Sequence, residues 1–222
     1  MANKIKQWSE AEIIDTFGLT KTKLNGKLST QSNTNLLKEW LNTTTILSSE
    51  DATTVSNLAQ EALENVENWN EEDLKMNFIA FIIAISGLKS NDKFRSLYEK
   101  TVQATVEGHF LKTKTDFMIA KGVMDLVKVP YFHFQEYKKE KDPNGDPLAQ
   151  LVEAFLIAQE KNKNGKPMYG AYVVGRFWYF VTMEGKNYCV SNAYNSTEEK
   201  DLIQIIAILR HFKIILEATL LD

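Results

Sequence analysis

An acid and a base lie two residues apart at the end of an apolar run in this chain. The run Val129–Phe134 leads into Glu136 and Lys138. Because side chains alternate along a strand, a strand here would place Phe132, Phe134, Glu136 and Lys138 on one face. The two aromatic side chains would anchor that face in a core, and the acid and the base would emerge at its carboxyl end. A carboxylate and an ammonium so placed can hold a metal ion and a water molecule together, which is the chemistry of metal-dependent phosphodiester hydrolysis.

The pattern alone is a weak signal, because four carboxylates precede a lysine by two residues: Asp73 with Lys75, Glu136 with Lys138, Glu184 with Lys186, and Glu198 with Lys200. The first pair lies in a predicted helix, where residues two apart do not face each other. The third spans a predicted turn, and the fourth opens a predicted helix. Only Glu136 and Lys138 end an apolar strand. The plain alternative is that Lys138 pairs with Glu136 or with solvent.

A divalent cation needs further hard oxygen ligands and open positions for a phosphate oxygen and a water. Asp116 directly precedes the apolar run Phe117–Ala120, and the interval to Glu136 leaves room for an antiparallel hairpin. Asp125 is the competing acid, although little chain separates it from the second strand. With these acids as ligands, Lys138 would orient or deprotonate the attacking water and offset charge on the phosphate.

Composition limits the other classes of function. The chain has 222 residues, a net charge of −3 and a pI of about 5.7, which argue against a sequence-specific DNA binder that relies on a basic surface. One cysteine, Cys189, excludes an internal disulfide and a cysteine-based zinc site. The densest apolar segment, Phe78–Ile85, is too short to span a bilayer, and the start has no signal-peptide pattern. We expect a soluble, cytoplasmic protein.

The elements that must position these residues follow from periodicity and capping signals. Helices are predicted at 31–47, from 48 to about 66, from the Asn70 cap to about 85, at 91–107, at 147–160 after the Asp146 cap, and at 197–220. Strands are predicted at 110–120, 129–138, 168–174, 176–183 and 187–191. This order predicts an α/β (α+β) fold, a sheet flanked by helices. We divide it into an N-terminal helical region, 1–69, packed on a core domain, 70–222.

The order of these features resembles the PD-(D/E)XK nuclease superfamily over about residues 70–215. The closest likeness is to the nuclease domains of type I restriction-enzyme R subunits and their small bacterial relatives. The hairpin Gly175-x-x-Trp178-x-Phe180 is similar to a pattern in that branch. Thr115 stands where the proline that names the motif would be. The resemblance implies a restriction-endonuclease-like mixed sheet flanked by helices.

The resemblance also assigns roles to residues. Asp116 and Glu136 would be metal-binding acids, and Lys138 the family lysine. Gln150, on the helix after the lysine strand, would position the substrate or the catalytic groups. The segment from Asn70 to Ile79 is similar to the family's first helix, whose glutamate faces the metal; Glu71 is the better match, and Glu72 is its rival. Lys161, Lys163 and Lys166, with Lys139, Lys141 and Arg176, could form a basic rim beside the site, although lysines are more often simply solvated.

The expected function is therefore that of a Mg²⁺- or Mn²⁺-dependent endonuclease acting on DNA, in restriction, defence or DNA processing. Its metal ligands would be Glu71, Asp116 and Glu136, and its catalytic residues Asp116, Glu136, Lys138 and Gln150. A second copy or a partner subunit would supply DNA targeting. The alternative is a catalytically inactive nuclease-like binding or assembly module, which the acidic pI favours. A plain helical adaptor with an accessory sheet would leave Asp116 and Glu136 apart in space.

Overall fold

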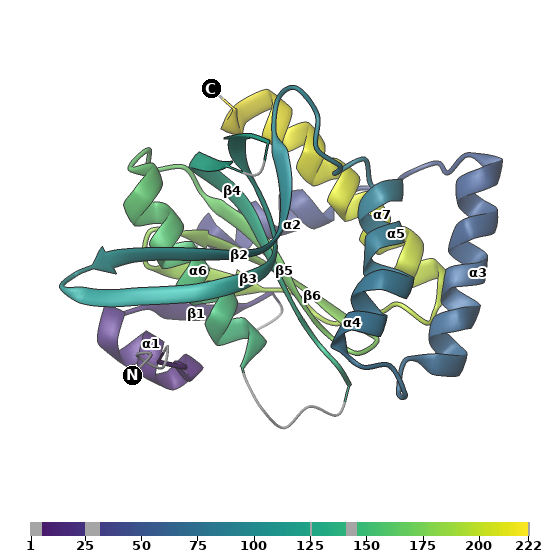
Figure 1. Cartoon of the computed structure of the whole chain (residues 1–222), viewed down its shortest axis with the longest axis horizontal. Coiled ribbons are helices and arrows are strands. Elements are labelled where there is room, and N and C mark those ends of the chain that lie inside the picture. The colour runs from purple at the N-terminus through teal and green to yellow at the C-terminus, as the bar shows by residue number, and fades with distance from the viewer. Residues whose placement is uncertain (1–5, 25–31, 125, 141–145, 222) are drawn as a thin grey trace.

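One mixed sheet organises the chain (Figure 1). The computed structural model describes residues 6–24, 32–124, 126–140 and 146–221. Within them the strands are β1 (Thr20–Lys23), β2 (Arg95–Val106), β3 (His109–Val123), β4 (Leu126–Lys138), β5 (Met168–Val174), β6 (Phe177–Glu184), β7 (Asn187–Val190) and β8 (Tyr194–Asn195). Their order is β1-β7-β6-β5-β4-β3-β2, with β8 paired to β6. Pairing is parallel between β4 and β5 and between β1 and β7, and antiparallel elsewhere.

Helices cover both faces of this sheet. They are α1 (Glu10–Phe17), α2 (Ser32–Leu41), α3 (Ser49–Asn65), α4 (Glu71–Leu74), α5 (Ala80–Ile85), α6 (Pro147–Asn162) and α7 (Glu199–Ile215). Two π-helical segments, η1 (Lys75–Ile79) and η2 (Leu216–Leu220), continue α4 and α7. One core lies between the sheet and α2, α3, α5 and α7, and the other between the sheet and α1 and α6 (Figure 1). The mixed α/β fold with an N-terminal helical region is as predicted from the sequence.

The connection from β4 through α6 to β5 decides where polar side chains can gather. β4 and β5 run parallel, so the chain must cross over between them, and α6 provides this crossover. Asp146 caps α6 by accepting a hydrogen bond from the Ala149 amide (3.0 Å), and Pro147 occupies the first turn. The carboxyl end of β4, with Lys138, therefore lies at the same edge of the sheet as the start of α6.

Two expectations about local structure are wrong. Residues 91–107 were expected to be a helix, but β2 forms there and pairs with β3 along most of its length. Its buried residues alternate at Val102, Ala104 and Val106, the spacing of a strand that covers α6 with one face. The expectation that Phe132 and Phe134 share a face also fails. The pairing of β3 with β4 shifts at Ala120, because Ile119 pairs with His133 but Ala120 pairs with Tyr131. Phe132 and Phe134 therefore pack into opposite cores.

The region before residue 70 contributes more than helices. β1 was not predicted, and it adds a parallel strand to β7 at the sheet edge. The division of the chain at 69/70 stays a prediction.

Among the described residues, no helix is long and apolar enough to cross a membrane.

Candidate active site

β3 and β4 bring the two predicted acids side by side. Phe117 pairs with Gln135 in the antiparallel register, and Asp116 and Glu136 are the next residues along. The Tyr137 amide donates a hydrogen bond to Asp116 Oδ2 at 2.7 Å. Asp116 is 7% exposed and Glu136 is 1% exposed, so both carboxyl groups lie inside the protein. The reading as a helical adaptor, which needs these acids to be apart, is therefore wrong.

Burial dominates the electrostatics of this pair. It raises the pKa of Glu136 well above its ordinary value, and the neighbouring carboxylate of Asp116 raises it further. Burial also raises the pKa of Asp116, although ion pairing with Lys75 and the Tyr137 amide oppose the shift. Glu136 Oε1 has no hydrogen-bond partner among the described residues. Two adjacent buried carboxyl groups, one with an unpartnered oxygen, are suited to binding a cation or a proton.

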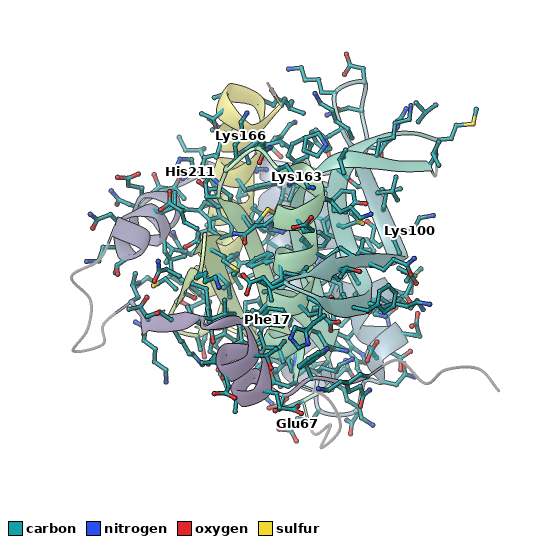
Figure 2. All side chains as sticks on the ribbon, turned by 90° about the vertical axis from the view of Figure 1, so that its left-hand side faces the viewer. Phe17, Glu67, Lys100, Lys163, Lys166 and His211 are labelled. Atoms are coloured by element: carbon teal, nitrogen blue, oxygen red, sulfur yellow. The ribbon has the colours of Figure 1, made fainter. Side chains whose placement is uncertain are left out.

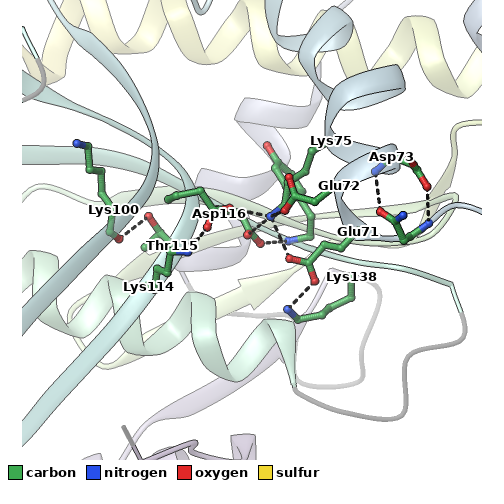
Figure 3. A network of polar contacts seen from close by, with 12 residues as sticks. Glu71, Glu72, Asp73, Lys75, Lys100, Lys114, Thr115, Asp116 and Lys138 are labelled. Atoms are coloured by element: carbon green, nitrogen blue, oxygen red, sulfur yellow. Dashed lines mark hydrogen bonds and ion pairs between the residues drawn. The ribbon is translucent and has the colours of Figure 1, made fainter. Parts of the chain in front are cut away.

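The start of α4 positions the third acid. Asn70 Oδ1 accepts from the Asp73 amide (2.9 Å), and Asp73 Oδ2 accepts from the Asn70 amide (3.2 Å), a reciprocal cap that fixes the first turn. Glu71 then reaches Lys138, with 3.2 Å between Oε2 and Nζ (Figure 3). Its rival, Glu72, has a side chain that is 74% exposed. The structure therefore brings Glu71 to the site beside Asp116, Glu136 and Lys138.

Lys75 lies at the centre of these acids and was not identified from the sequence. Its ammonium lies 2.8 Å from Asp116 Oδ1, 3.0 Å from Glu71 Oε1 and 2.7 Å from Glu99 Oε1 (Figure 3). Burial would lower the pKa of this side chain, but the carboxylates of Asp116 and Glu99 outweigh burial and raise it well above its ordinary value. Lys75 is therefore a charged cation held among carboxylates, and its side chain is 14% exposed.

Glu99 is the second residue that the sequence did not reveal. It stands across from Asp116 on β2, between the pairs Tyr98–Phe117 and Lys100–Thr115. Its φ of 55° lies in the left-handed region, which costs a non-glycine residue on the order of 1 kcal/mol or more. Burial raises the pKa of Glu99, but the ammonium groups of Lys114 and Lys75 outweigh burial and lower it to about 2. Ion pairs thus hold Glu99 ionised in a strained conformation at the site.

Gln150 lies in the first turn of α6. It lines a cavity of about 190 Å³ between α6, residues 112–114 of β3, and residues 6–8. None of Glu71, Asp116, Glu136 and Lys138 is among the described residues that line this cavity. The Gln150 Oε1 atom is buried and has no hydrogen-bond partner among the described residues. The role of Gln150 beside the other predicted site residues stays a prediction.

Glu153 faces the same cavity and should make stability depend on pH. Its Oε1 accepts from the Lys112 amide (3.1 Å), and burial raises its pKa from 4.5 to about 7. The folded state therefore holds this proton more tightly than the unfolded state, so stability falls as pH rises from about 4.5 to 7. In Glu153→Gln the amide oxygen can keep the hydrogen bond without titrating. The wild type should lose roughly 2 kcal/mol more than the variant between pH 5 and pH 8.

Urea unfolding at the two pH values measures this difference. Glu160→Gln provides the control, because it removes a more exposed carboxylate of the same helix, one that pairs with Lys163 (3.3 Å). It should follow the wild-type pH profile. If Glu153→Gln also follows that profile, Glu153 does not titrate in this range.

The proposed basic rim is not assembled. α6 has 16 residues and is about 24 Å long, so Lys161, Lys163 and Lys166 lie at the opposite end of the helix from Lys138. Figure 2 shows Lys163 and Lys166 far from Glu67, which pairs with Arg176 (2.9 Å) near the end of β4. Arg176 also pairs with Glu140 (3.1 Å), so it offers little free positive charge.

Three further residues were considered from the sequence: Lys139, Lys141 and Asp125. Lys139 is exposed next to Lys138. Lys141, from the proposed rim, and Asp125, the competitor of Asp116, lie outside the described residues.

The donor chemistry fits a hard divalent cation, but the arrangement fits only in part. Three carboxylates lie together, and Glu136 Oε1 has no hydrogen-bond partner in the part of the chain that the structure describes. However, ammonium groups contact both oxygens of Glu71 and one oxygen of Asp116. Among the described residues, no group of three or more acidic, histidine or cysteine side chains is arranged to hold a metal ion. With Lys75 in this position, the acids do not form a complete metal site.

The site can therefore take up a proton or a cation at Glu136 and Asp116, and the Lys138 ammonium lies beside these acids, held by Glu71. The Lys138 side chain is 17% exposed, enough for water or a ligand oxygen to reach it. No protein-family model and no curated protein matches this sequence.

Proposed function

We propose that this protein is a divalent-metal-dependent nuclease that hydrolyses phosphodiester bonds in DNA. One observation carries the proposal: the buried carboxyl groups of Asp116 and Glu136 converge from neighbouring strands, beside a lysine that a third acid holds in place. The resemblance to the PD-(D/E)XK superfamily, and to a restriction-endonuclease-like fold, supports it. In that resemblance the same positions on a mixed sheet carry the acids and the lysine.

Each residue of the site has a task in this proposal. Asp116 and Glu136, with Glu71, supply hard oxygen ligands for a Mg²⁺ or Mn²⁺ ion, which would activate water and neutralise phosphate charge. Lys138 donates to the attacking water or to a phosphate oxygen, offsetting the negative charge that develops there. Glu71 holds the Lys138 ammonium in place through the 3.2 Å contact. The adjacent Lys139 is exposed to solvent and takes no part in the proposed chemistry.

DNA rather than RNA follows from the resemblance to restriction enzymes, as does a role in restriction, defence or DNA processing. The net charge of −3 gives no overall attraction to a nucleic acid. We therefore propose that a second copy of the chain or a partner subunit brings DNA to the site. The protein itself provides the cleavage chemistry.

The proposal is tested by incubating the purified chain with supercoiled plasmid. We expect nicking with Mg²⁺ or Mn²⁺ and none with a chelator in excess. Asp116→Asn, purified in parallel, should not nick, because its amide cannot supply a negative oxygen ligand. Equal nicking by both preparations would mean contamination or a different site, and no nicking by the wild type at any metal or protein concentration would contradict the proposal.

A second function is favoured by the ion pairs of Lys75. Its ammonium already neutralises oxygens of Asp116 and Glu71, as expected for a nuclease-like fold kept as a binding or assembly module. Calorimetry separates the two functions. Absence of divalent-cation binding at millimolar concentrations, together with no cleavage of DNA, would favour such a module, whereas binding that Asp116→Asn abolishes would support the nuclease.

A further inference from the structure

The acids around Lys75 outnumber the cations. Among the described residues, five carboxyl groups (Glu71, Glu72, Glu99, Asp116 and Glu136) face three ammonium groups (Lys75, Lys114 and Lys138), an excess of two. Glu136 is 1% exposed and its Oε1 has no described partner. An excess of two carboxyl groups can be balanced by two protons or by one divalent cation. The cluster therefore carries the charge of a cation site, and a lysine occupies its centre.

Lys75 contacts the oxygens that a metal ion would use. Its Nζ lies 2.8 Å from Asp116 Oδ1, while Asp116 Oδ2 is taken by the Tyr137 amide. A Mg²⁺ ion bound at Asp116 Oδ1 would lie at about 2.1 Å from that oxygen, and thus within about 5 Å of the ammonium. Two cations that share one carboxylate oxygen in a largely buried site repel each other strongly. Metal and ammonium thus compete for Asp116.

Lys75 also contacts two carboxylates outside the predicted metal ligands. Glu99 Oε1 lies 2.7 Å and Glu72 Oε1 lies 3.3 Å from its ammonium. These two carboxylates are the exposed ones of its four partners, with side chains 41% and 74% exposed. A Lys75 ammonium displaced from Asp116 and Glu71 has Glu99 and Glu72 left as partners. The ammonium need not become unpaired when a metal ion enters.

We propose that Lys75 is a tethered counter-ion, which holds Glu71 and Asp116 together in the metal-free protein and which a divalent cation displaces toward Glu72 and Glu99. This inference rests on the proposed function, because it concerns the metal site of the nuclease. Lys75 sets the metal concentration at which that site fills. It also explains why the acids converge without forming a complete site while the lysine is in place.

The test is Mn²⁺ binding to the full chain, measured by calorimetry. Lys75→Gln should bind Mn²⁺ at least 10-fold more tightly than the wild type, and Mn²⁺ should raise its melting temperature by a larger amount. Lys93→Gln is the control: Lys93 also pairs with a glutamate, Glu217 (3.1 Å), but outside the cluster, so its Mn²⁺ affinity should equal that of the wild type. Equal or weaker binding by Lys75→Gln overturns the inference.

A second measurement uses the wild type and needs no variant to fold. Lysine acetylation, followed by mass spectrometry, should modify Lys75 slowly without metal and at least several-fold faster with saturating Mn²⁺. Lys93, with a side chain 52% exposed, should react equally in both states. If Mn²⁺ binds but Lys75 keeps its slow rate, the ammonium is not displaced and the inference is overturned.

Failure of this inference can be told apart from failure of the nuclease proposal, because neither readout uses DNA. Tighter Mn²⁺ binding by Lys75→Gln in a chain that nicks no DNA would support the counter-ion and contradict the nuclease. Metal-dependent nicking, with the same Mn²⁺ affinity in Lys75→Gln and the wild type, would support the nuclease and contradict the counter-ion.

Discussion

Glu136→Gln should lower the nicking rate on the order of 10³-fold, because a bound metal ion contributes several kcal/mol to the barrier and each 1.36 kcal/mol is tenfold in rate. The same change should stabilise the protein. Glu136 lies against Asp116 in the interior, where two carboxyl groups repel when ionised. The glutamine amide can instead donate to Asp116, which should add about 1 kcal/mol and raise the melting temperature by roughly 2–4 °C.

Plasmid nicking and thermal unfolding at pH 8 measure the two effects. Glu184→Gln is a matched control, because Glu184 also precedes a lysine by two residues but is exposed at the end of β6. It should change neither quantity. If Glu136→Gln keeps wild-type nicking, Glu136 has no part in the chemistry. If it loses both activity and stability, the lost nicking reflects damage to the fold.

Lys138→Ala should lower the nicking rate by about 10²- to 10⁴-fold, the usual contribution of a positioned acid or base. Its effect on stability should be small. The side chains of Lys138 and Glu71 are 17% and 32% exposed, and an ion pair that water reaches contributes about 1 kcal/mol at most. Glu71 also keeps its contact with Lys75 at 3.0 Å, so the site retains its shape. This variant should therefore lose nicking activity while it keeps nearly the stability of the wild type.

Single-turnover nicking, with urea unfolding alongside, checks this separation. Lys139→Ala removes the same charge from the next residue, which is exposed, and should stay within about twofold of the wild type. Wild-type nicking by Lys138→Ala would remove the lysine from the mechanism. An equal loss in both variants would point to general attraction of DNA by positive charge.

Local signals in the sequence predicted the elements that hold the acids. The apolar, aromatic run 129–134 identified β4, the Asn70 cap identified the start of α4, and the Asp146–Pro147 pair identified the start of α6. β2 was predicted to be a helix, but its buried residues alternate from Val102 on; this alternation is interrupted around Glu99, where the backbone takes a positive φ. The long pairing with β3 decides its structure, and such pairing is a tertiary effect that a local pattern does not contain.

The acids of the site were predictable, but the contacts between them were not. Asp116 and Glu136 follow from the hairpin that joins their strands. Lys75 was set aside because its spacing from Asp73 means little in a helix, and its partners Glu99 and Asp116 are distant in sequence. Gln150 was placed from resemblance alone, and the structure shows it lining a cavity beside residues 112–114 of β3. The spacing of residues along the sequence does not determine contacts that depend on strand register and helix rotation.

The π-helical segment Lys75–Ile79 lies between Glu71 and the buried part of the same helix. A π-helical turn holds about one residue more than an α-helical turn, so this wide turn takes up an extra residue while Glu71 keeps its angular position relative to the buried Ile82 and Ile83. Deleting one residue there would convert the turn to α-helix with little change in that angle. Inserting a further residue would rotate Glu71 by about 100° and move it away from Lys138.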